Sequence, residues 1–121
     1  MIRATTPKHI FAFENDPSEF SRILVTYSQN GQIVLEKTQD DMTFGVETDE
    51  KTGDEIYVAW YRLSQEETLR FKSEQPTCGV HGKKQTKVSV QVRVLTAGGE
   101  ALASQPFEVS VEDVQNDEVL T

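Results

Sequence analysis

Cys78 and His81 lie three positions apart, and their side chains could act together in catalysis or in metal binding. A thiolate beside an imidazole can act as a nucleophile pair or supply half of a zinc site. A structural zinc ion needs four ligands, and the only other histidine of the chain is His9, in the first expected strand. A catalytic pair needs a rigid geometry and a third, orienting group, which a glycine-flanked loop does not supply. We therefore expect ordinary loop residues here, with no metal and no cofactor.

Adjacent carboxylates occur at Asp40-Asp41 and at Asp49-Glu50. Both pairs fall where turns are expected, and aspartate is favoured in turns because its side chain binds nearby backbone amides. A glycosidase pair needs two carboxylates that face each other across a cleft, and segment 49–54 lacks the spacing of an EF-hand calcium loop. No catalytic set of residues emerges, so we expect that the protein is not an enzyme.

The 121 residues include 20 acidic and 12 basic side chains, which gives a net charge of −8. This length fits one domain, and the acidic balance argues against nucleic-acid binding, which requires a basic surface. The single cysteine cannot form an intramolecular disulfide, which favours a reducing compartment. The apolar runs are far shorter than the ~20 residues that span a bilayer, and the start of the chain has no signal-peptide pattern. We expect no membrane partner and a cytoplasmic location, or assembly from the cytoplasm.

Apolar and polar residues alternate with a period of two in short segments separated by turns, and no segment repeats with the helical period. This pattern predicts an all-β protein, an immunoglobulin-like or fibronectin-like antiparallel sandwich. A capping box at Ser64 and Glu67 predicts a short helix over about 65–71 that crosses between the sheets. The domain is expected to span 1–112, followed by an acidic tail at 113–121. The expected strands are seven: 8–14, 21–28, 32–38, 42–47, 55–63, 86–96 and 100–112.

The turn at 29–31 can be tested by asking which loop length brings apolar residues together on one face. A three-residue loop with glycine in the left-handed position would place Tyr27 opposite Ile33. The same loop would place Val25 opposite Leu35, so a three-residue loop is predicted.

The last hairpin gives a different result, because a two-residue Gly98-Gly99 turn would keep one face apolar. Pro106 cannot donate a ladder hydrogen bond, so we expect its strand to lie at an edge or to bend there. The expected pairs are Val94 with Ala103, Val90 with Phe107, and Val88 with Val109.

Strand 55–63 is apolar on both faces, which a strand half exposed to water does not require. One interpretation is a central strand whose second face is covered by the following segment. The other is a subunit contact, because aromatic residues are enriched in interface cores. The candidate interaction residues in this strand are Tyr57, Trp60 and Tyr61.

Two further charged segments are candidate contact sites. The cluster His81, Lys83 and Lys84 is basic on an acidic protein. It is either a solvated loop tip or a contact to an acidic partner surface or to the protein's own tail. In that tail, Asp117 and Glu118 are the candidate residues, and the tail could become ordered on assembly.

Six segments, taken in order, resemble small β-rich structural proteins encoded in prophages and mobile elements of gut Firmicutes. The resemblance covers most of the chain, but the loops at 48–54 and 76–85 look like insertions. It implies a virion structural role, and no catalytic residues transfer with it. The segments are TTPKHIF (5–11), ILVTYSQNG (23–31), LSQEETL (63–69), VQVRVLT (90–96), ALAS (101–104) and NDEVL (116–120).

These observations lead us to expect a non-enzymatic virion structural or assembly protein, a tail or head-tail component. It would act through contacts with other virion proteins or with itself, by a sheet face or by a strand edge. The alternative is a carbohydrate- or adhesion-type sandwich module, which would expose Trp60 or a tyrosine in a shallow groove.

Overall fold

The computed structural model describes residues 1–72, 86–111 and 118–121. The described part is mostly β-structure, with one short α-helix and two 3₁₀ turns, so the expected all-β class is confirmed. The strands are β1 (Lys8–Phe13), β2 (Arg22–Gln29), β3 (Gln32–Thr38), β4 (Thr43–Thr48), β5 (Glu55–Arg62), β6 (Thr86–Leu95), β7 (Ala101–Ala103) and β8 (Phe107–Val111). The helix is α1 (Gln65–Leu69), and the 3₁₀ turns are η1 (Pro17–Glu19) and η2 (Gln39–Asp41).

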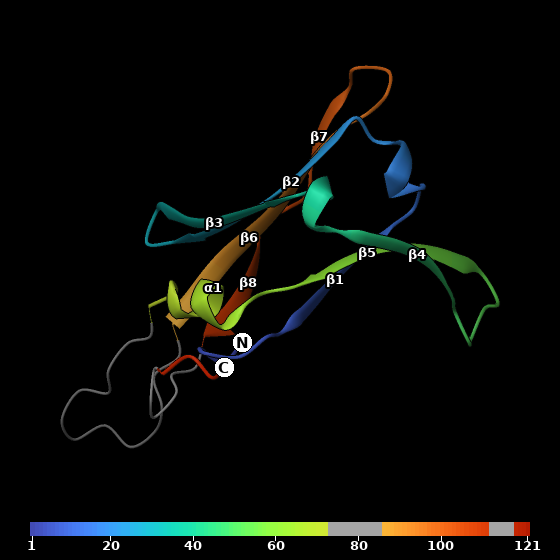
Figure 1. Cartoon of the computed structure of the whole chain (residues 1–121). Helices are drawn as coiled ribbons and strands as arrows, with labels where there is room; N and C mark the ends of the chain where they lie inside the picture. The colour runs from blue at the N-terminus through green and yellow to red at the C-terminus, as the bar shows by residue number, and fades with distance from the viewer. Residues whose placement is uncertain (73–85, 112–117) are drawn as a thin grey trace.

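The strands form two antiparallel sheets that pack face to face. The first sheet has the order β1-β5-β4. The second has the order β3-β2-β6, and β7 and β8 follow one another along the far side of β6. In Figure 1, β1, β5 and β4 run across the direction of β2, β6 and β8, and the β4–β5 hairpin reaches beyond the second sheet.

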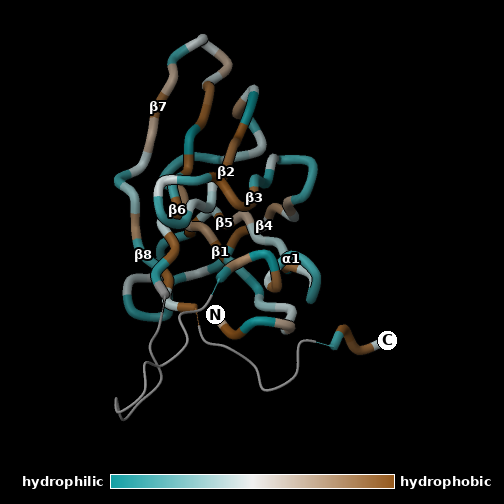
Figure 2. Tube along the Cα trace, turned by 90° about the vertical axis from the view of Figure 1, so that its left-hand side faces the viewer, coloured by the Kyte–Doolittle hydropathy of each residue, from teal (hydrophilic) through white to brown (hydrophobic). Residues whose placement is uncertain are grey.

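The core lies between the sheets because alternate residues of each strand point inward. β2 shows this clearly, since Ile23, Val25, Tyr27 and Gln29 are buried and the residues between them are not. Figure 2 shows hydrophobic stretches along the packed strands and hydrophilic stretches at the turns. The buried cluster takes residues from both sheets and from the segment after the helix: Ile23, Val25, Tyr27, Leu35, Tyr61, Leu63, Phe71, Val88, Val90, Val92 and Val111.

The β2–β3 hairpin corrects the predicted loop length. Its loop has two residues, Asn30 and Gly31, both with positive φ (52° and 76°), as a type I′ turn requires. This turn places Ser28 opposite Ile33, but the register then shifts, and Tyr27 lies opposite Leu35. The apolar residues are therefore brought together by a bulge within the strand and not by a longer loop.

The last hairpin also differs from its prediction. Thr96 and Glu100 close a three-residue loop, and within it Gly99 is left-handed with a φ of 85°. Val94 consequently lies opposite Leu102, not Ala103.

Beyond this loop, the expected pairing of Val90 with Phe107 and of Val88 with Val109 is confirmed. The expected single strand is interrupted at 104–106, a segment that includes Pro106, and one extra residue there restores the register. Both β7 and β8 lie at the edge of the sheet, as the proline predicts.

The predicted helix and its cap are present, although the helix ends two residues early. The Ser64 hydroxyl accepts from the Glu67 amide, and the Glu67 carboxylate accepts from the Ser64 amide. Just after the helix, Phe71 is buried in the core. The Gln29 side chain then holds Lys72 through two hydrogen bonds to its backbone, at 2.7 and 2.8 Å.

The loop after β6 can be tested with two neighbouring glycines. Gly99→Ala should lower the free energy of unfolding by about 1 kcal/mol, because a left-handed conformation penalises a Cβ atom. Gly98→Ala is the matched control, since Gly98 has no positive φ and a Cβ atom there meets only an ordinary contact, 3.9 Å from Thr96 Oγ1. Urea unfolding of both variants measures the difference. Equal losses would instead indicate a two-residue turn in which both glycines are left-handed.

Candidate functional site

The structure describes four of the predicted interaction residues: Tyr57, Trp60, Tyr61 and Glu118. His81, Lys83, Lys84 and Asp117 lie outside the described residues. Tyr57 and Trp60 are half-buried and point to opposite faces of β5, which is the central strand of its sheet. Glu118 is exposed. The described candidates therefore do not form one surface.

Trp60 lies on the outer face of the first sheet, opposite Ile10 of β1. The Lys8 ammonium lies 4.2 Å from the centre of the Trp60 ring, a cation–π arrangement. One face of the indole is thereby occupied by a charged group of the same sheet. Ile10 remains an exposed neighbour of the ring, and the sequence analysis did not single it out.

Tyr61 corrects the expected interaction surface, because its side chain is only 3% exposed and lies between the sheets. Its hydroxyl hydrogen-bonds to the hydroxyl of Tyr27, and the Tyr27 hydroxyl is 2.6 Å from Nδ1 of His9. These three side chains join β1, β5 and β2 through a chain of hydrogen bonds across the core. Tyr61 is thus a core residue and is not available to a partner.

Burial determines the protonation states of these three hydrogen-bonded side chains. It raises the pKa of both tyrosines well above the ordinary value, so both remain neutral phenols at neutral pH. Burial also lowers the pKa of His9, and the N-terminal ammonium adds to that effect. At neutral pH the three hydrogen-bonded side chains are therefore uncharged. They support the fold and include no activated nucleophile.

A charged pair closes one side of this polar centre. Lys37 Nζ lies 2.5 Å from a Glu67 carboxylate oxygen, and 5.9 Å from the centre of the Tyr61 ring. Burial alone would raise the pKa of Glu67. The hydrogen bonds from Lys37 and from the Ser64 amide outweigh that effect and hold the pKa below its ordinary value. The half-buried carboxylate therefore has its partners within the fold.

One aspartate of each adjacent carboxylate pair acts as a turn residue. Asp41 accepts a hydrogen bond of 2.9 Å from the amide of Thr38 at the start of η2. Asp49 accepts one of the same length from the amide of Lys51 in the β4–β5 turn. Both bonds are the local side chain to backbone contacts for which turns favour aspartate.

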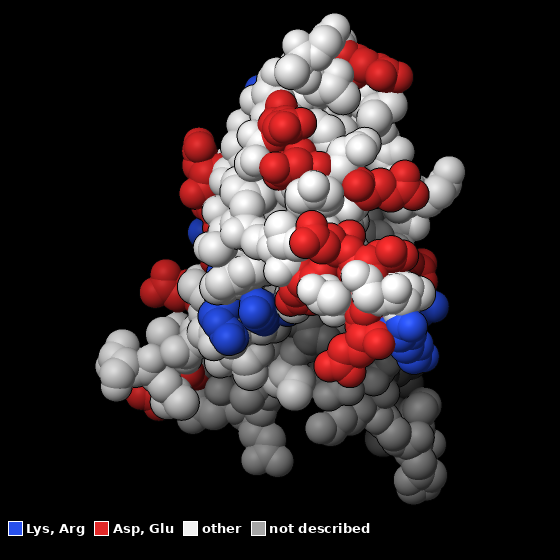
Figure 3. Space-filling model, turned by 90° about the vertical axis from the view of Figure 1, so that its right-hand side faces the viewer, with Lys and Arg blue, Asp and Glu red and all other residues white. Residues whose placement is uncertain are grey.

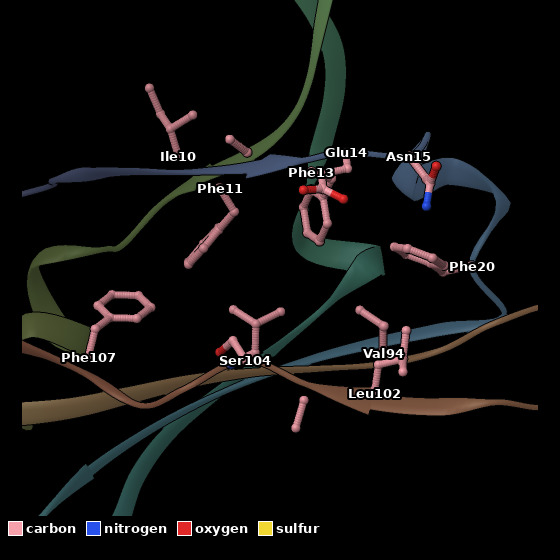
Figure 4. A pocket seen from close by; sticks show the side chains of 13 residues that line it. Ile10, Phe11, Phe13, Glu14, Asn15, Phe20, Val94, Leu102, Ser104 and Phe107 are labelled. Atoms are coloured by element: carbon pink, nitrogen blue, oxygen red, sulfur yellow. Dashed lines mark hydrogen bonds between the residues drawn. The ribbon is translucent and has the colours of Figure 1, made fainter.

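An open cavity lies between the two sheets, along the edge formed by β1 on one side and β7 and β8 on the other. It has a volume of about 780 Å³. We call it the intersheet groove. Figure 4 shows Phe11 and Phe13 pointing into it from β1, and Phe107 and Val94 lying on the opposite side. Its main apolar lining is Phe11, Phe13, Phe20, Val94, Leu102 and Phe107.

The groove continues along β1 into a smaller cavity of about 230 Å³ that His9 and Tyr27 help to line. Ile10, Phe11 and Phe107 border both cavities. One end of the groove thus reaches the hydrogen-bonded chain in the core.

The groove is open because the first sheet is one strand narrower than the second. The first sheet has three strands, whereas the second has four strand positions. These are β3, β2, β6 and an edge position that β7 and β8 share, one after the other along β6. Leu102 and Phe107 point inward with Val94 and Val90, their partners on β6, yet they are 48% and 43% exposed. Within the described residues no strand of the first sheet lies opposite them.

The apolar pairing of Phe107 follows from the sequence, whereas the groove does not. The alternation of β8 shows that Phe107 faces inward, whereas the number of strands in the opposite sheet depends on long-range pairing. The exposed apolar residues beside a strand-breaking Pro106 were the available local signal.

No protein-family model matches the chain, and neither a curated protein nor a solved structure has significant similarity to it. In the part of the chain that the structure describes, no helix is long and apolar enough to cross a membrane. The described residues also contain no group of three or more His, Cys, Asp or Glu side chains that could hold a metal ion. The intersheet groove and the strand edges beside it are the features from which a function is inferred.

Acidification should destabilise the fold through His9. The folded protein holds the pKa of His9 below its unfolded value of about 6.5, so the unfolded chain takes up the proton first. The free energy of unfolding then falls as the pH drops through about 6.5 toward the lower folded pKa. Urea unfolding between pH 8 and pH 5 should show this loss, and a smaller one in His9→Gln, whose amide can still accept from Tyr27. If the free energy of unfolding falls equally with pH in the two proteins, this role of His9 is contradicted.

Proposed function

We propose that the protein is a non-enzymatic structural or assembly component of a phage-type particle, and that it works by accepting a strand of a partner at the intersheet groove. The observation that carries this proposal is the narrower first sheet, which leaves inward-pointing Leu102 and Phe107 exposed. An extended peptide that pairs with a sheet edge can form main-chain hydrogen bonds and place alternate side chains in a pocket. The resemblance to prophage structural proteins supports the particle as the setting.

The strand order supports an immunoglobulin-like sandwich that lacks its first strand. In that architecture the sheets run A-B-E-D and C-F-G, and the variable type adds C′ beside C. Taking β1 as strand B, β1-β5-β4 corresponds to B-E-D, and β3-β2-β6 with β7 and β8 corresponds to C′-C-F-G. Strand A would lie beside β1, above β7 and β8. In residues 1–72, 86–111 and 118–121, no strand takes that place.

The N-terminus of the protein itself occupies one end of the position where strand A would lie. The N-terminal ammonium of Met1 donates to the Ser110 carbonyl oxygen of β8 at 2.7 Å. The part of the groove left for a partner is therefore bordered by the second half of β1 on one side and by β7 and the start of β8 on the other.

The carbohydrate-binding alternative receives less support from the described surface. Such a module presents a free aromatic face to a sugar ring, whereas the Trp60 ring is half-buried with Lys8 over it. The outer face around Trp60 is for the same reason a weaker candidate for a protein contact than the groove.

Substitution of the groove should abolish partner binding. The double variant Leu102→Ser, Phe107→Ser removes two apolar contacts, and Ile33→Ser is the matched control, since Ile33 is exposed at the opposite edge of the same sheet. Binding to itself and to the proteins encoded by neighbouring genes can be measured by biolayer interferometry, with thermal melts to verify folding. We expect at least one interaction, weakened tenfold or more by the double variant and unchanged by the control. A protein that binds none of them, or binds equally well after the groove substitutions, would contradict the proposal.

A further inference from the structure

The β1–β5 ladder determines where an added strand forms its hydrogen bonds. The Leu63 amide donates to the Pro7 carbonyl oxygen at 3.0 Å, so these two residues form a hydrogen-bonded pair. Hydrogen-bonded and non-hydrogen-bonded pairs alternate along antiparallel strands, and residues of the second kind direct their main-chain groups away from the partner strand. In β1 these residues are Lys8, Ile10 and Ala12. An added strand therefore bonds to them.

An antiparallel added strand needs apolar residues at alternate positions. Residues that lie opposite one another in antiparallel strands point to the same face of the sheet. Ile10 points outward with its partner Trp60, so the added residues that bond to Ile10 and Ala12 also point outward. The added residues opposite Phe11 and Phe13 point into the groove, as these two phenylalanines do (Figure 4). Those two added residues must be apolar to cover the exposed lining.

The layer beneath the free edge of β1 limits what can carry the added strand. β7 and β8 already lie in that layer, on the opposite side of the groove. A strand backed by its own second sheet would bring that sheet into the same layer, where it would collide with β7 and β8. The occupant is therefore an extended segment that projects from its own fold.

The projecting strand of this chain, β4, does not fit. The Asp49 amide donates to the Asp54 carbonyl oxygen at 2.8 Å, so by alternation Phe44 and Val46 direct their main-chain groups to the free edge of β4. Both side chains lie on the inner face of the first sheet. Antiparallel addition of β4 to β1 would turn them away from the groove, and parallel addition would set the acidic turn of 47–55 beside the acids that follow β1.

The two ends of the groove carry opposite charges. Among the described residues that line the groove, only Glu14 is charged, and Asp16 and Glu19 follow it in the sequence. Figure 3 views the side of the molecule at which β1 ends, and acidic side chains predominate there. At the other end, Lys8 lines the smaller cavity, and Arg62 is its pairing partner on β5. A basic residue of an added strand is thus attracted to the first end and repelled from the second.

We propose that the groove receives a projecting segment of another protein that runs antiparallel to β1 with the pattern basic, apolar, any residue, apolar; this inference rests on the proposed function above. The basic residue lies opposite Glu14, and the two apolar residues lie opposite Phe13 and Phe11. The segment covers positions 10–14 of β1 and its end, which the N-terminus leaves free. Antiparallel pairing matches the described strand pairs of both sheets and is slightly more stable per residue than parallel pairing.

A pair of peptides with one composition tests this pattern. The first is acetyl-Lys-Val-Thr-Leu-Thr-amide, which places Lys beside Glu14 and directs Val and Leu inward. The control, acetyl-Thr-Val-Thr-Leu-Lys-amide, keeps the alternation but places Lys opposite Ile10, next to Lys8. NMR titration of the isotopically labelled protein measures both dissociation constants. We expect shifts in β1 and β7, and about fivefold weaker binding of the control, because one surface ion pair is lost and a like-charge contact is gained.

Two single variants test the contact to Glu14. Glu14→Lys should weaken binding of the first peptide about threefold and should strengthen binding of the same peptide with Glu in place of Lys. Glu36→Lys is the matched control, because Glu36 is also exposed and lies on β3, at the opposite edge of the second sheet. It should leave both dissociation constants unchanged. Both substitutions are at exposed positions, so the folded protein is retained.

The remaining outcomes separate this inference from the proposed function. Equal binding of the two peptides, or binding of neither, would overturn the basic-apolar pattern, and tighter binding of the control would overturn the antiparallel direction. In each case, binding of a neighbouring-gene product that is lost in the variant Leu102→Ser, Phe107→Ser would leave the proposed function standing. Self-association that is lost in the same variant would overturn another protein as the occupant and identify a second copy. Peptide binding that this variant leaves unchanged would contradict both proposals.

Discussion

The difference in width between the two sheets is the constraint on which the rest of the structure depends. Three strands cannot cover four strand positions, so one strip of apolar surface must stay open on the second sheet. The strip lies under the free edge of β1, where Leu102 and Phe107 point inward without a covering strand. The same first sheet projects at its other edge and leaves the inner face of β4 uncovered. Both surfaces therefore follow from the way one narrow sheet sits on a wider one.

The polar chain in the core keeps the narrow sheet in place. His9 of β1 and Tyr61 of β5 both connect to Tyr27 of β2, in the middle of the opposite sheet. Sliding the first sheet over β7 and β8 would break these bonds and leave buried hydroxyl groups unpaired, which costs about 1–3 kcal/mol for each group. The hydrogen bonds thus fix the offset that leaves the groove open, and they connect the stability of the core to the availability of the edge.

The sequence predicted features that depend on local chemistry. The capping box of Ser64, the edge position near Pro106 and the pairing of Phe107 with Val90 all follow from side-chain type and short-range register. Loop lengths were wrong in both hairpins, because bulges near Val34 and at 104–106 restore the register that a different loop would have supplied. Alternation also shows that strand 55–63 has two apolar faces. It does not show which face packs inward, and Tyr61 was placed in a contact surface for that reason.

Amide hydrogen exchange, measured on the protein alone and in the bound state, tests most directly whether the free edge of β1 accepts a strand. Strands β2 and β6 already have partners on both sides, whereas β1 has one. A strand added to β1 predicts slower exchange in β1 in the bound state, with β2 and β6 unchanged. Exchange in β1 that is equal in the free and bound states, or protection confined to other strands, would contradict this account.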